Sequence, residues 1–379
     1  MDIKIAFIST CTYATPPRTY GGECFWWNLC CAFSQMGHFV HLFAAAGSKC
    51  PSNGKLTYNI CTYGETANRV AESNVPKLYM PEILDADYII DASHEKLVMQ
   101  EIWNFHREHA WKTINVLNGL VTGWPMCHKW NIVVGSQKWK ELSLLGLSQF
   151  HETPWAKDYG AVLTPLPPGS IVAVIPWATN TEFYCPSDYS KEDYFLWFSR
   201  PTPYKGLHRA IRLAQDMGIR LVVAMPMEIS EHQYFGEHYL QQINEAVAKG
   251  AKIEFVKLPG DSRHHIAKRE LYRKAKALLF TIEAAEPFGL TVIESLACGT
   301  PVIASRIGAM PEIIKHGETG YLAHIDSDDG FKMAIENIEK IDPKACVEDA
   351  RKRFDRSVAA VRYIELWQKL KEEHENTSG

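Results

Sequence analysis

Two glutamates stand eight positions apart in the stretch EPFGLTVIE, at Glu286 and Glu294. If this stretch were helical throughout, a rotation of about 100° per residue would leave the two carboxylates roughly 80° apart and more than two turns distant. They could not share one proton as a pair. The proline and the glycine between them instead predict a loop, with a helix that begins near Leu290. Glu286 then belongs to the loop and Glu294 to the second turn of the helix.

The start of this helix could bind an anion. The backbone N–H groups of Gly289, Leu290 and Thr291 are expected to point out of the helix start, which suits a diphosphate. An ionised carboxylate accepts hydrogen bonds from hydroxyl groups, so Glu294 could hold a ribose and Glu286 a sugar. The alternative is that Glu286 only complements the helix dipole and that Glu294 is a solvated second-turn residue. The spacing alone does not separate these interpretations.

A second candidate is the stretch SRPTPYKG, residues 199–206. Arg200 closes an expected strand and Lys205 opens the next helix, so two cations flank one loop at a helix start, where the dipole also favours an anion. Basic residues are common on solvated loops as well. Ligands of open parallel sheets bind at the carboxyl ends of strands, and this position favours the binding interpretation.

The elements that must position these residues follow a repeated pattern. Short apolar runs, loops with Gly or Pro, and longer segments with helical periodicity alternate along the chain, which is typical of parallel α/β architecture. At 379 residues, two domains are expected, with a junction near residue 180 in a polar, turn-rich segment. The expected strands are 3–9, 38–45, 87–93, 111–119, 130–136 and 171–176 in the first half, a doubly wound sheet, and 194–200, 220–226, 252–258, 277–282 and 301–305 in the second. The first helix is expected from about Glu23 to Met36, closed by Gly37.

Composition limits the classes of function. The chain has 40 basic and 44 acidic residues and a net charge of -4, which argues against nucleic-acid binding as its main role. Its ten cysteines show no C-x-x-C pair, so reduced thiols in a cytoplasmic protein are expected. Neither a signal peptide nor a membrane-spanning segment is predicted. The basic segment 263–276 is expected to be a solvated helix, with peripheral contact to an anionic membrane as the alternative.

Five separated motifs occur in an order typical of one enzyme family. They are YGGE (20–23), VIPWATNTEFY (174–184), FSRPTPYKG (198–206), EPFGLTVIE with SLACGTPVIAS (286–305), and GAMPEIIKHGETGYL (308–322). With them the chain resembles the retaining glycosyltransferases of the GT-B fold, in the family-4 group (glycosyl transferases group 1). The resemblance implies two Rossmann-like domains facing each other across an interdomain cleft. It places an acceptor-binding domain at 1–178, a donor-binding domain at 179–355, and a helix crossing back to the first domain at 356–379.

The resemblance also implies roles for single residues. Arg200 and Lys205 would bind the donor diphosphate and neutralise the leaving group, and Glu294 would hold the ribose. Glu286 would be catalytic, because it would contact the sugar hydroxyls near the reacting carbon. The remaining donor-binding positions implied in this half and in the loop after the first strand are Gly22, Lys257, Leu258, Phe288, Gly289, Leu290 and Thr291.

The first domain departs from the family pattern at one position. Many relatives carry a His at the end of the strand that spans 111–119, where this chain has Asn118. His94 follows the strand 87–93 and either faces the cleft as a catalytic residue or caps the helix that begins there. Asn118 can hydrogen-bond a sugar but cannot titrate near neutral pH. Which of the two completes this side of the site stays open.

The implied reaction moves a glucose-, mannose- or N-acetylglucosamine-type hexosyl group from a UDP- or GDP-linked sugar to a hydroxyl acceptor. The acceptor would be a sugar, a small molecule or a glycolipid, and transfer would retain the anomeric configuration without a metal or a separate cofactor. The motifs DAD (85–87) and DSD (326–328) are not placed as expected for a metal site. Two alternatives are a non-catalytic nucleotide-sugar-binding protein, which Asn118 allows, and an NAD-dependent dehydrogenase, whose G-x-G-x-x-G does not follow the first strand.

Overall fold

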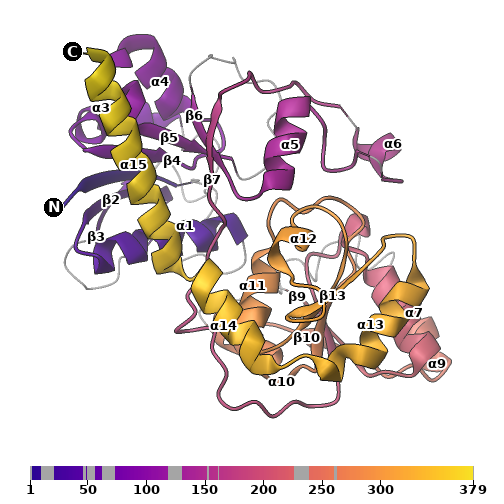
Figure 1. Cartoon of the computed structure of the whole chain (residues 1–379). Coiled ribbons are helices and arrows are strands. Elements are labelled where there is room, and N and C mark those ends of the chain that lie inside the picture. The colour runs from indigo at the N-terminus through magenta and orange to yellow at the C-terminus, as the bar shows by residue number, and fades with distance from the viewer. Residues whose placement is uncertain are drawn as a thin grey trace.

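The chain forms two β-sheets, each built of parallel strands and covered by helices (Figure 1). The structure is a computed structural model that describes residues 2–9, 21–45, 48, 56–61, 73–117, 130–151, 153–160, 162–225, 239–259 and 263–378. Every strand pairing within each sheet is parallel. The expected α/β class with two parallel sheets is confirmed.

The first sheet has seven strands in the order β3-β2-β1-β4-β5-β6-β7. Their bounds are β1 Lys4–Ile8, β2 Phe39–Ala45, β3 Leu56–Cys61, β4 Tyr88–Asp91, β5 Thr113–Val116, β6 Asn131–Val134 and β7 Ile171–Val174. The helices described in this half are α1 Gly21–Gln35, α3 Asn74–Leu84, α4 Leu97–Phe105, η1 Arg107–Lys112, α5 Gln137–Leu145 and α6 Ala156–Tyr159. All the strands expected in the first half are found, and β3 is a strand that the sequence did not predict.

The second sheet has six strands in the order β10-β9-β8-β11-β12-β13. Their bounds are β8 Phe195–Phe198, β9 Leu221–Met225, β10 Ile253–Lys257, β11 Ala277–Phe280, β12 Val302–Ser305 and β13 Gly320–Ala323. The helices described here are η2 Pro203–Lys205, α7 Leu207–Met217, α9 Leu240–Ala248, α10 His264–Lys274, α11 Leu290–Ala297, α12 Met310–Ile313, α13 Asp328–Asn337, η4 Ile338–Lys340, α14 Pro343–Phe354 and α15 Arg356–Ser378. The unpredicted strand here is β13.

Each sheet reverses its strand order beside its first strand. The chain moves outward from β1 to β2 and β3 and then returns to β4 on the other side of β1, and β8 and β11 repeat this arrangement. Loops that leave the carboxyl ends of two such neighbouring strands diverge to opposite faces, so the ends form a ligand-binding position. The loops after β8 and β11 carry the candidate residues of the second half.

The last helix, α15, leaves the second sheet and packs on the first. It begins beside α14 and runs along α1 (Figure 1). The Tyr88 hydroxyl donates to the carbonyl of Tyr363 at 3.2 Å, and Trp367 Nε1 donates to the carbonyl of Asp87 at 3.0 Å. The expected domain limits at 178 and 355 fall between β7 and β8 and just before α15, and they stay predictions.

Candidate functional site

The loops after β8 and β11 lie backbone against backbone. The N–H of Glu283 donates to the carbonyl of Tyr204 at 2.7 Å, and the Thr281 hydroxyl donates to the carbonyl of Gly206, also at 2.7 Å. Gly206 has a φ of 70°, and a Cβ there would lie 1.8 Å from the carbonyl oxygen of Thr281. Only glycine fits this position, because any side chain would push the two loops apart.

This contact brings Lys205 and Glu286 together as an ion pair. Their side chains are 10% and 22% exposed, so both charges lie near the surface of the protein but are largely shielded by it. The pair joins two motifs that the sequence analysis assigned to one donor site. Arg200, from the same loop as Lys205, is exposed.

The motif at 308–312 holds the backbone of Glu286. The N–H of Ala309 donates to the carbonyl of Glu286 at 3.0 Å. Gly308 has a φ of 60°, and a Cβ added there would lie 2.3 Å from the backbone nitrogen of Glu286. The glycine of this motif therefore allows the close approach that positions Glu286.

The helix after this loop begins where the sequence predicted. Gly289, with a φ of 108°, is the N-cap residue of α11, and Leu290 is its first residue. Leu290 and Thr291 thus have backbone N–H groups without partners inside the helix, as expected for an anion site. Phe288 is buried and packs on Trp177 and Phe354, with ring centroids 6.0 and 5.8 Å away. Phe288 therefore has a core role beside any contact with a donor.

Glu294 lies in a buried cluster of charged and aromatic side chains. Its carboxylate oxygens are 3.0 and 2.9 Å from Lys268 Nζ, and the Tyr272 hydroxyl is 3.3 Å from Oε2. Glu294 and Lys268 are 4% and 7% exposed. The alternative of a solvated second-turn glutamate is wrong, since this carboxylate is buried and paired.

The basic helix α10 is likewise not a uniformly solvated face. Lys268 is buried against Glu294, and Arg269 lies over the ring of Phe183 with a separation of 4.6 Å. Arg273 Nε donates to the carbonyl of Cys185 at 2.6 Å. These three cations hold α10 against α11 and the segment before β8. Sequence periodicity missed Lys268 as a site residue, because a lysine at a helix surface position usually remains in water.

The proposed base-binding positions lie at the end of β10, before α10 in the chain. Lys257, the last residue of β10, is exposed, and Leu258 is buried. His264, the first residue of α10, is also buried, and burial lowers its pKa to about 3. His264 is therefore neutral at physiological pH. The roles of Lys257 and Leu258 stay predictions.

The first sheet presents His94 at the carboxyl end of β4. His94 is exposed in the bend between β4 and α4. Gly22 lies in the first turn of α1, which begins two residues before the expected Glu23, and no longer belongs to the loop. Asn118 falls outside the described residues. The roles of these three residues stay predictions.

Lys96 lies at the same carboxyl end of the first sheet, and the sequence did not identify it as a residue of the site. It is 1% exposed, and its Nζ donates to the carbonyls of Asp91 at 2.7 Å and Val116 at 3.0 Å, which are the last residues of β4 and β5. Its φ of 52° is the one positive value found at a non-glycine residue within the described ranges. Such strained backbone is kept only where the surrounding contacts impose it.

Hydrogen bonds also join the two halves of the chain near the candidate site. The carboxylate of Glu312 accepts from the backbone N–H groups of Gln137 and Lys138 at the start of α5, each at 2.8 Å. Ser136 Oγ donates to the carbonyl of Pro287 at 2.8 Å. The loop of Glu286 and the helix α5 are therefore held next to each other. These contacts span well over a hundred residues, so no local sequence signal predicts them.

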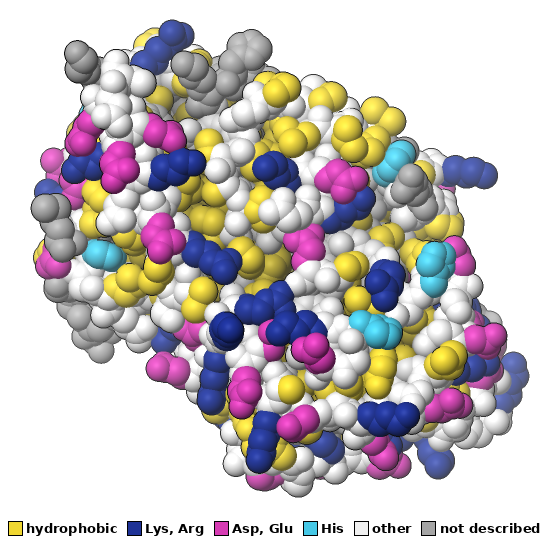
Figure 2. Space-filling view, in the orientation of Figure 1, with side chains coloured by type: hydrophobic (Ala, Val, Ile, Leu, Met, Phe, Trp, Pro, Cys, Tyr) yellow, Lys and Arg dark blue, Asp and Glu magenta, His cyan; other side chains and the backbone are white. Residues whose placement is uncertain are grey.

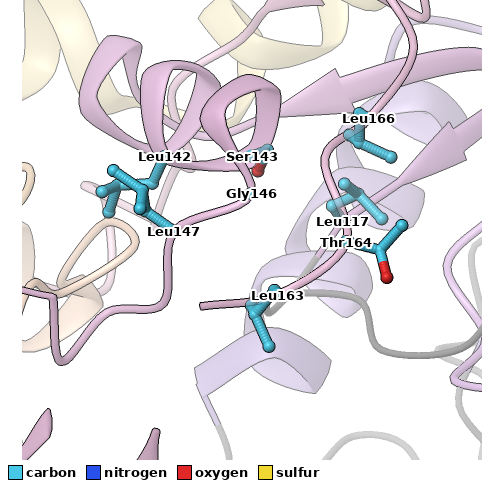
Figure 3. A pocket seen from close by; sticks show the side chains of 8 residues that line it. All are labelled: Leu117, Leu142, Ser143, Gly146, Leu147, Leu163, Thr164 and Leu166. Carbon is cyan, nitrogen blue, oxygen red and sulfur yellow. The ribbon is translucent and has the colours of Figure 1, made fainter. Parts of the chain in front are cut away.

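A small apolar pocket lies beside the end of β5 (Figure 3). It has a volume of about 10 Å³, room for about one water molecule, which is too small for a sugar. Its lining comes from α5, the end of β5 and the segment before β7, and consists of Leu117, Leu142, Ser143, Gly146, Leu147, Leu163, Thr164 and Leu166. It is a packing gap and not a donor site.

Acidic and basic side chains both occur over the face shown in Figure 2, and several Lys and Arg side chains lie next to one another near its middle. Within the described residues, no group of three or more His, Cys, Asp or Glu side chains is arranged to hold a metal ion. Among the same residues, no helix has the length and apolar character needed to cross a membrane.

The second half of the chain matches a known protein family. Residues 186–356, which contain Arg200, Lys205, Glu286 and Glu294, match the family model described as Glycosyl transferases group 1. Through these residues, the second half of the chain is similar to the glycosyl transferases group 1 family. The match contains the whole second sheet, so the two loops joined by Lys205 and Glu286 are features of a family domain.

Solved structures with the same fold extend over the whole chain. AviGT4, a glycosyltransferase involved in avilamycin A biosynthesis, superposes with a TM-score of 0.69 and 20% identity, over 97% of this chain and 98% of its own. HepE of Anabaena in complex with UDP-glucose superposes with a TM-score of 0.64 and 16% identity, over 99% and 100%. These likenesses confirm the GT-B fold for both halves.

Matches to curated proteins are shorter. N-acetyl-alpha-D-glucosaminyl L-malate synthase of Bacillus anthracis is 43% identical over 53 residues, which is 14% of this chain and 14% of that protein. The chain spans 14%, 41% and 19% of the lengths of three curated relatives that it matches.

Proposed function

We propose that this protein is a retaining glycosyltransferase that moves a hexosyl group from a nucleotide-diphosphate sugar to a hydroxyl acceptor. The observation that supports this most directly is the Lys205–Glu286 pair, which lies beside the start of α11 where the strand order reverses. An ammonium, a carboxylate and free backbone N–H groups then converge at one position. This combination suits a donor with both a diphosphate and sugar hydroxyls.

Each group has one task in the proposed complex. Arg200, Lys205 and the N–H groups of Leu290 and Thr291 bind the diphosphate. Glu294 accepts a hydrogen bond from the ribose, and Glu286 accepts from hydroxyls of the transferred sugar. The ion pair already holds Lys205 and Glu286 in place before the donor arrives, so little reorganisation is needed when charge develops on the leaving group.

In the proposed reaction, the bond between the anomeric carbon and the diphosphate oxygen breaks while the acceptor oxygen bonds to the same face of that carbon. The proton of the acceptor hydroxyl passes to the departing phosphate. Lys205 and Arg200 stabilise the negative charge that appears on this phosphate. Because these cations and α11 supply the positive charge, we propose that transfer proceeds without an added metal ion.

The donor and the acceptor are proposed by chemical class. A UDP-linked hexose is the first candidate, because a structure of the similar HepE is a complex with UDP-glucose. A GDP-linked hexose is the second. The acceptor is a hydroxyl of a sugar, a small molecule or a glycolipid. The protein is proposed to act in the cytoplasm.

Binding and turnover can be tested separately. A thermal-shift panel of UDP-, GDP- and ADP-hexoses, with NAD as a control, identifies the donor because a ligand that binds the native state raises the melting temperature. Release of the nucleoside diphosphate is then measured with and without a panel of hydroxyl acceptors, in the presence of EDTA, and the anomeric configuration of the product is determined by NMR. If a bound sugar nucleotide is never turned over faster with any acceptor, the protein is a non-catalytic binder and the proposal fails.

A further inference from the structure

The cation opposite Glu294 has no assigned role in donor binding. Lys268 lies on α10 and contacts both carboxylate oxygens of Glu294, at 3.0 and 2.9 Å. The side chains of Lys268 and Glu294 are only 8% and 5% exposed. A buried charge is strongly unfavourable without an opposite charge and good hydrogen bonds, so each side chain depends on the other.

Aromatic rings fix the position of Lys268. Its Nζ lies 5.3 Å from the ring centroid of Tyr184 and 5.6 Å from that of Phe198, within the range of cation–π attraction. Tyr184 belongs to the segment that joins the two halves, and Phe198 ends β8. The Tyr184 hydroxyl is in turn 3.1 Å from His265 Nδ1. The ammonium therefore has little freedom to move away from Glu294.

The remaining hydrogen-bonding capacity of Glu294 is small. A carboxylate has about four lone-pair sites. Lys268 donates to Oε1 at 3.0 Å and its Nζ lies 2.9 Å from Oε2, to which the Tyr272 hydroxyl donates at 3.3 Å. One site on Oε1 is left for a ligand. The geometry thus allows Glu294 to accept from one ribose hydroxyl.

We propose that Lys268 is a positioning residue for donor recognition, which holds the carboxylate of Glu294 turned so that Oε1 accepts one hydroxyl of the nucleotide ribose. This inference rests on the proposed function, because it concerns the same donor site. Without Lys268, the buried carboxylate loses its cation and the contact that fixes the direction of Oε1. Oε1 is then no longer held where a ribose hydroxyl could donate to it.

The test measures how well the protein distinguishes ribose from deoxyribose. Calorimetry with UDP, GDP and ADP first selects the nucleoside diphosphate that binds most tightly, and its 2′-deoxy and 3′-deoxy forms are then compared with it. The wild type is expected to bind the ribose form about tenfold more tightly than one deoxy form. Lys268→Met is expected to bind both about equally, and Lys268→Arg is expected to restore the preference. If Lys268 had a purely structural role, Lys268→Met would weaken the binding of the ribose form and of both deoxy forms to the same extent.

A double-mutant cycle keeps the test decisive if Lys268→Met does not fold. The pair Lys268→Met with Glu294→Gln removes both buried charges and leaves hydrogen-bonding groups of similar size. If Lys268 acts only through Glu294, this double variant has the same affinities for the ribose form and the two deoxy forms as Glu294→Gln alone. A further loss in the double variant would mean that Lys268 contacts the nucleotide itself, which overturns the positioning role.

The outcomes also separate the two proposals. If the wild type binds none of UDP, GDP and ADP, the proposed function fails. If it binds one of them without preferring ribose, or if Lys268→Met keeps the wild-type preference, only the inference about Lys268 fails.

Discussion

Lys205 and Glu286 form an ion pair although they lie 81 positions apart in the sequence. Each comes from a loop at the carboxyl end of a strand, and β8 and β11 are neighbours in the sheet. The pair places a cation that suits a phosphate directly beside a carboxylate that suits a sugar. The bond to be broken in the proposed reaction joins these two parts of the donor.

Glu286→Ala is expected to lower kcat at least about a hundredfold, because it removes a group proposed to contact the reacting sugar. The variant should still fold, with a moderately lower melting temperature because Lys205 loses its partner, since the backbone contacts of Glu286 with the 308–312 motif remain. Initial rates at saturating donor, together with the melting temperature, check both parts. Wild-type turnover in the folded variant would contradict the assignment.

Lys205→Ala and Arg200→Ala are each expected to weaken binding of the donor nucleoside diphosphate by about 1 to 3 kcal/mol, the loss of a charge-assisted hydrogen bond. Lys205→Ala should also lower kcat, because it leaves Glu286 without its cation, whereas Arg200→Ala should act mainly on binding. Calorimetric Kd values and steady-state rates measure the two effects. Lys369→Ala, an exposed site on α15, is the control and should change neither.

Gly308→Ala is expected to lower both stability and kcat. Its φ of 60° is unfavourable for alanine, and the added Cβ would lie 2.3 Å from the backbone nitrogen of Glu286, so the loop must shift. Gly317→Ala is a matched control, because its φ is 83° but no atom lies within 4 Å of the added Cβ. The control should cost about 1 kcal/mol from backbone strain alone. Equal losses of stability and kcat in both variants, by urea unfolding and initial rates, would show that the contact with Glu286 does not matter.

The sequence predicted the elements that carry the second half of the site, because strand and helix signals are local. The break of EPFGLTVIE into a loop and a helix that begins at Leu290 is confirmed. The strand β13 was missed, since it has four residues and begins with a glycine. That glycine is needed because a Cβ on Gly320 would lie 2.0 Å from the carbonyl oxygen of Val302 in β12, a contact that only the folded sheet creates.

The partners of the site residues could not be predicted, because they come from distant segments. Lys268 resembles any other lysine of a basic helix until Tyr184 and Phe198 are placed around it. Glu312 resembles an ordinary first-turn glutamate of a short helix until α5 from the other half presents its N–H groups. Each of these side chains lies on the surface of its own helix, and it is buried or paired only because another element packs against that helix.

Lys96→Met is expected to destabilise the protein by about 3 to 5 kcal/mol, because it leaves Asp91 buried without its cation. The ends of β4 and β5 also lose the lysine that joins their carbonyls. Lys4→Met is the control, since Lys4 and its partner Asp85 are 61% and 74% exposed and such a pair contributes about 0 to 1 kcal/mol. Urea unfolding measures both. A loss for Lys96→Met no larger than that for Lys4→Met would contradict a buried pair.

His264 is expected to make the protein less stable as the pH falls. Burial, helped by the nearby charges of Lys268 and His265, lowers the pKa of His264 to about 3 in the folded state, whereas an unfolded histidine has a pKa of about 6.5. Between these values the unfolded chain binds a proton that the folded chain does not, so the free energy of unfolding decreases as the pH is lowered, by up to about 1.4 kcal/mol per pH unit. Stability from this residue is fully present above about pH 6.5 and declines down to about pH 3. His264→Phe, which fills a similar volume and does not titrate, should reduce this slope in urea unfolding at pH 7, 6 and 5, whereas His324→Gln, at an exposed site, should keep it. An unchanged slope in His264→Phe would mean that His264 takes up a proton in the folded protein as readily as in the unfolded chain.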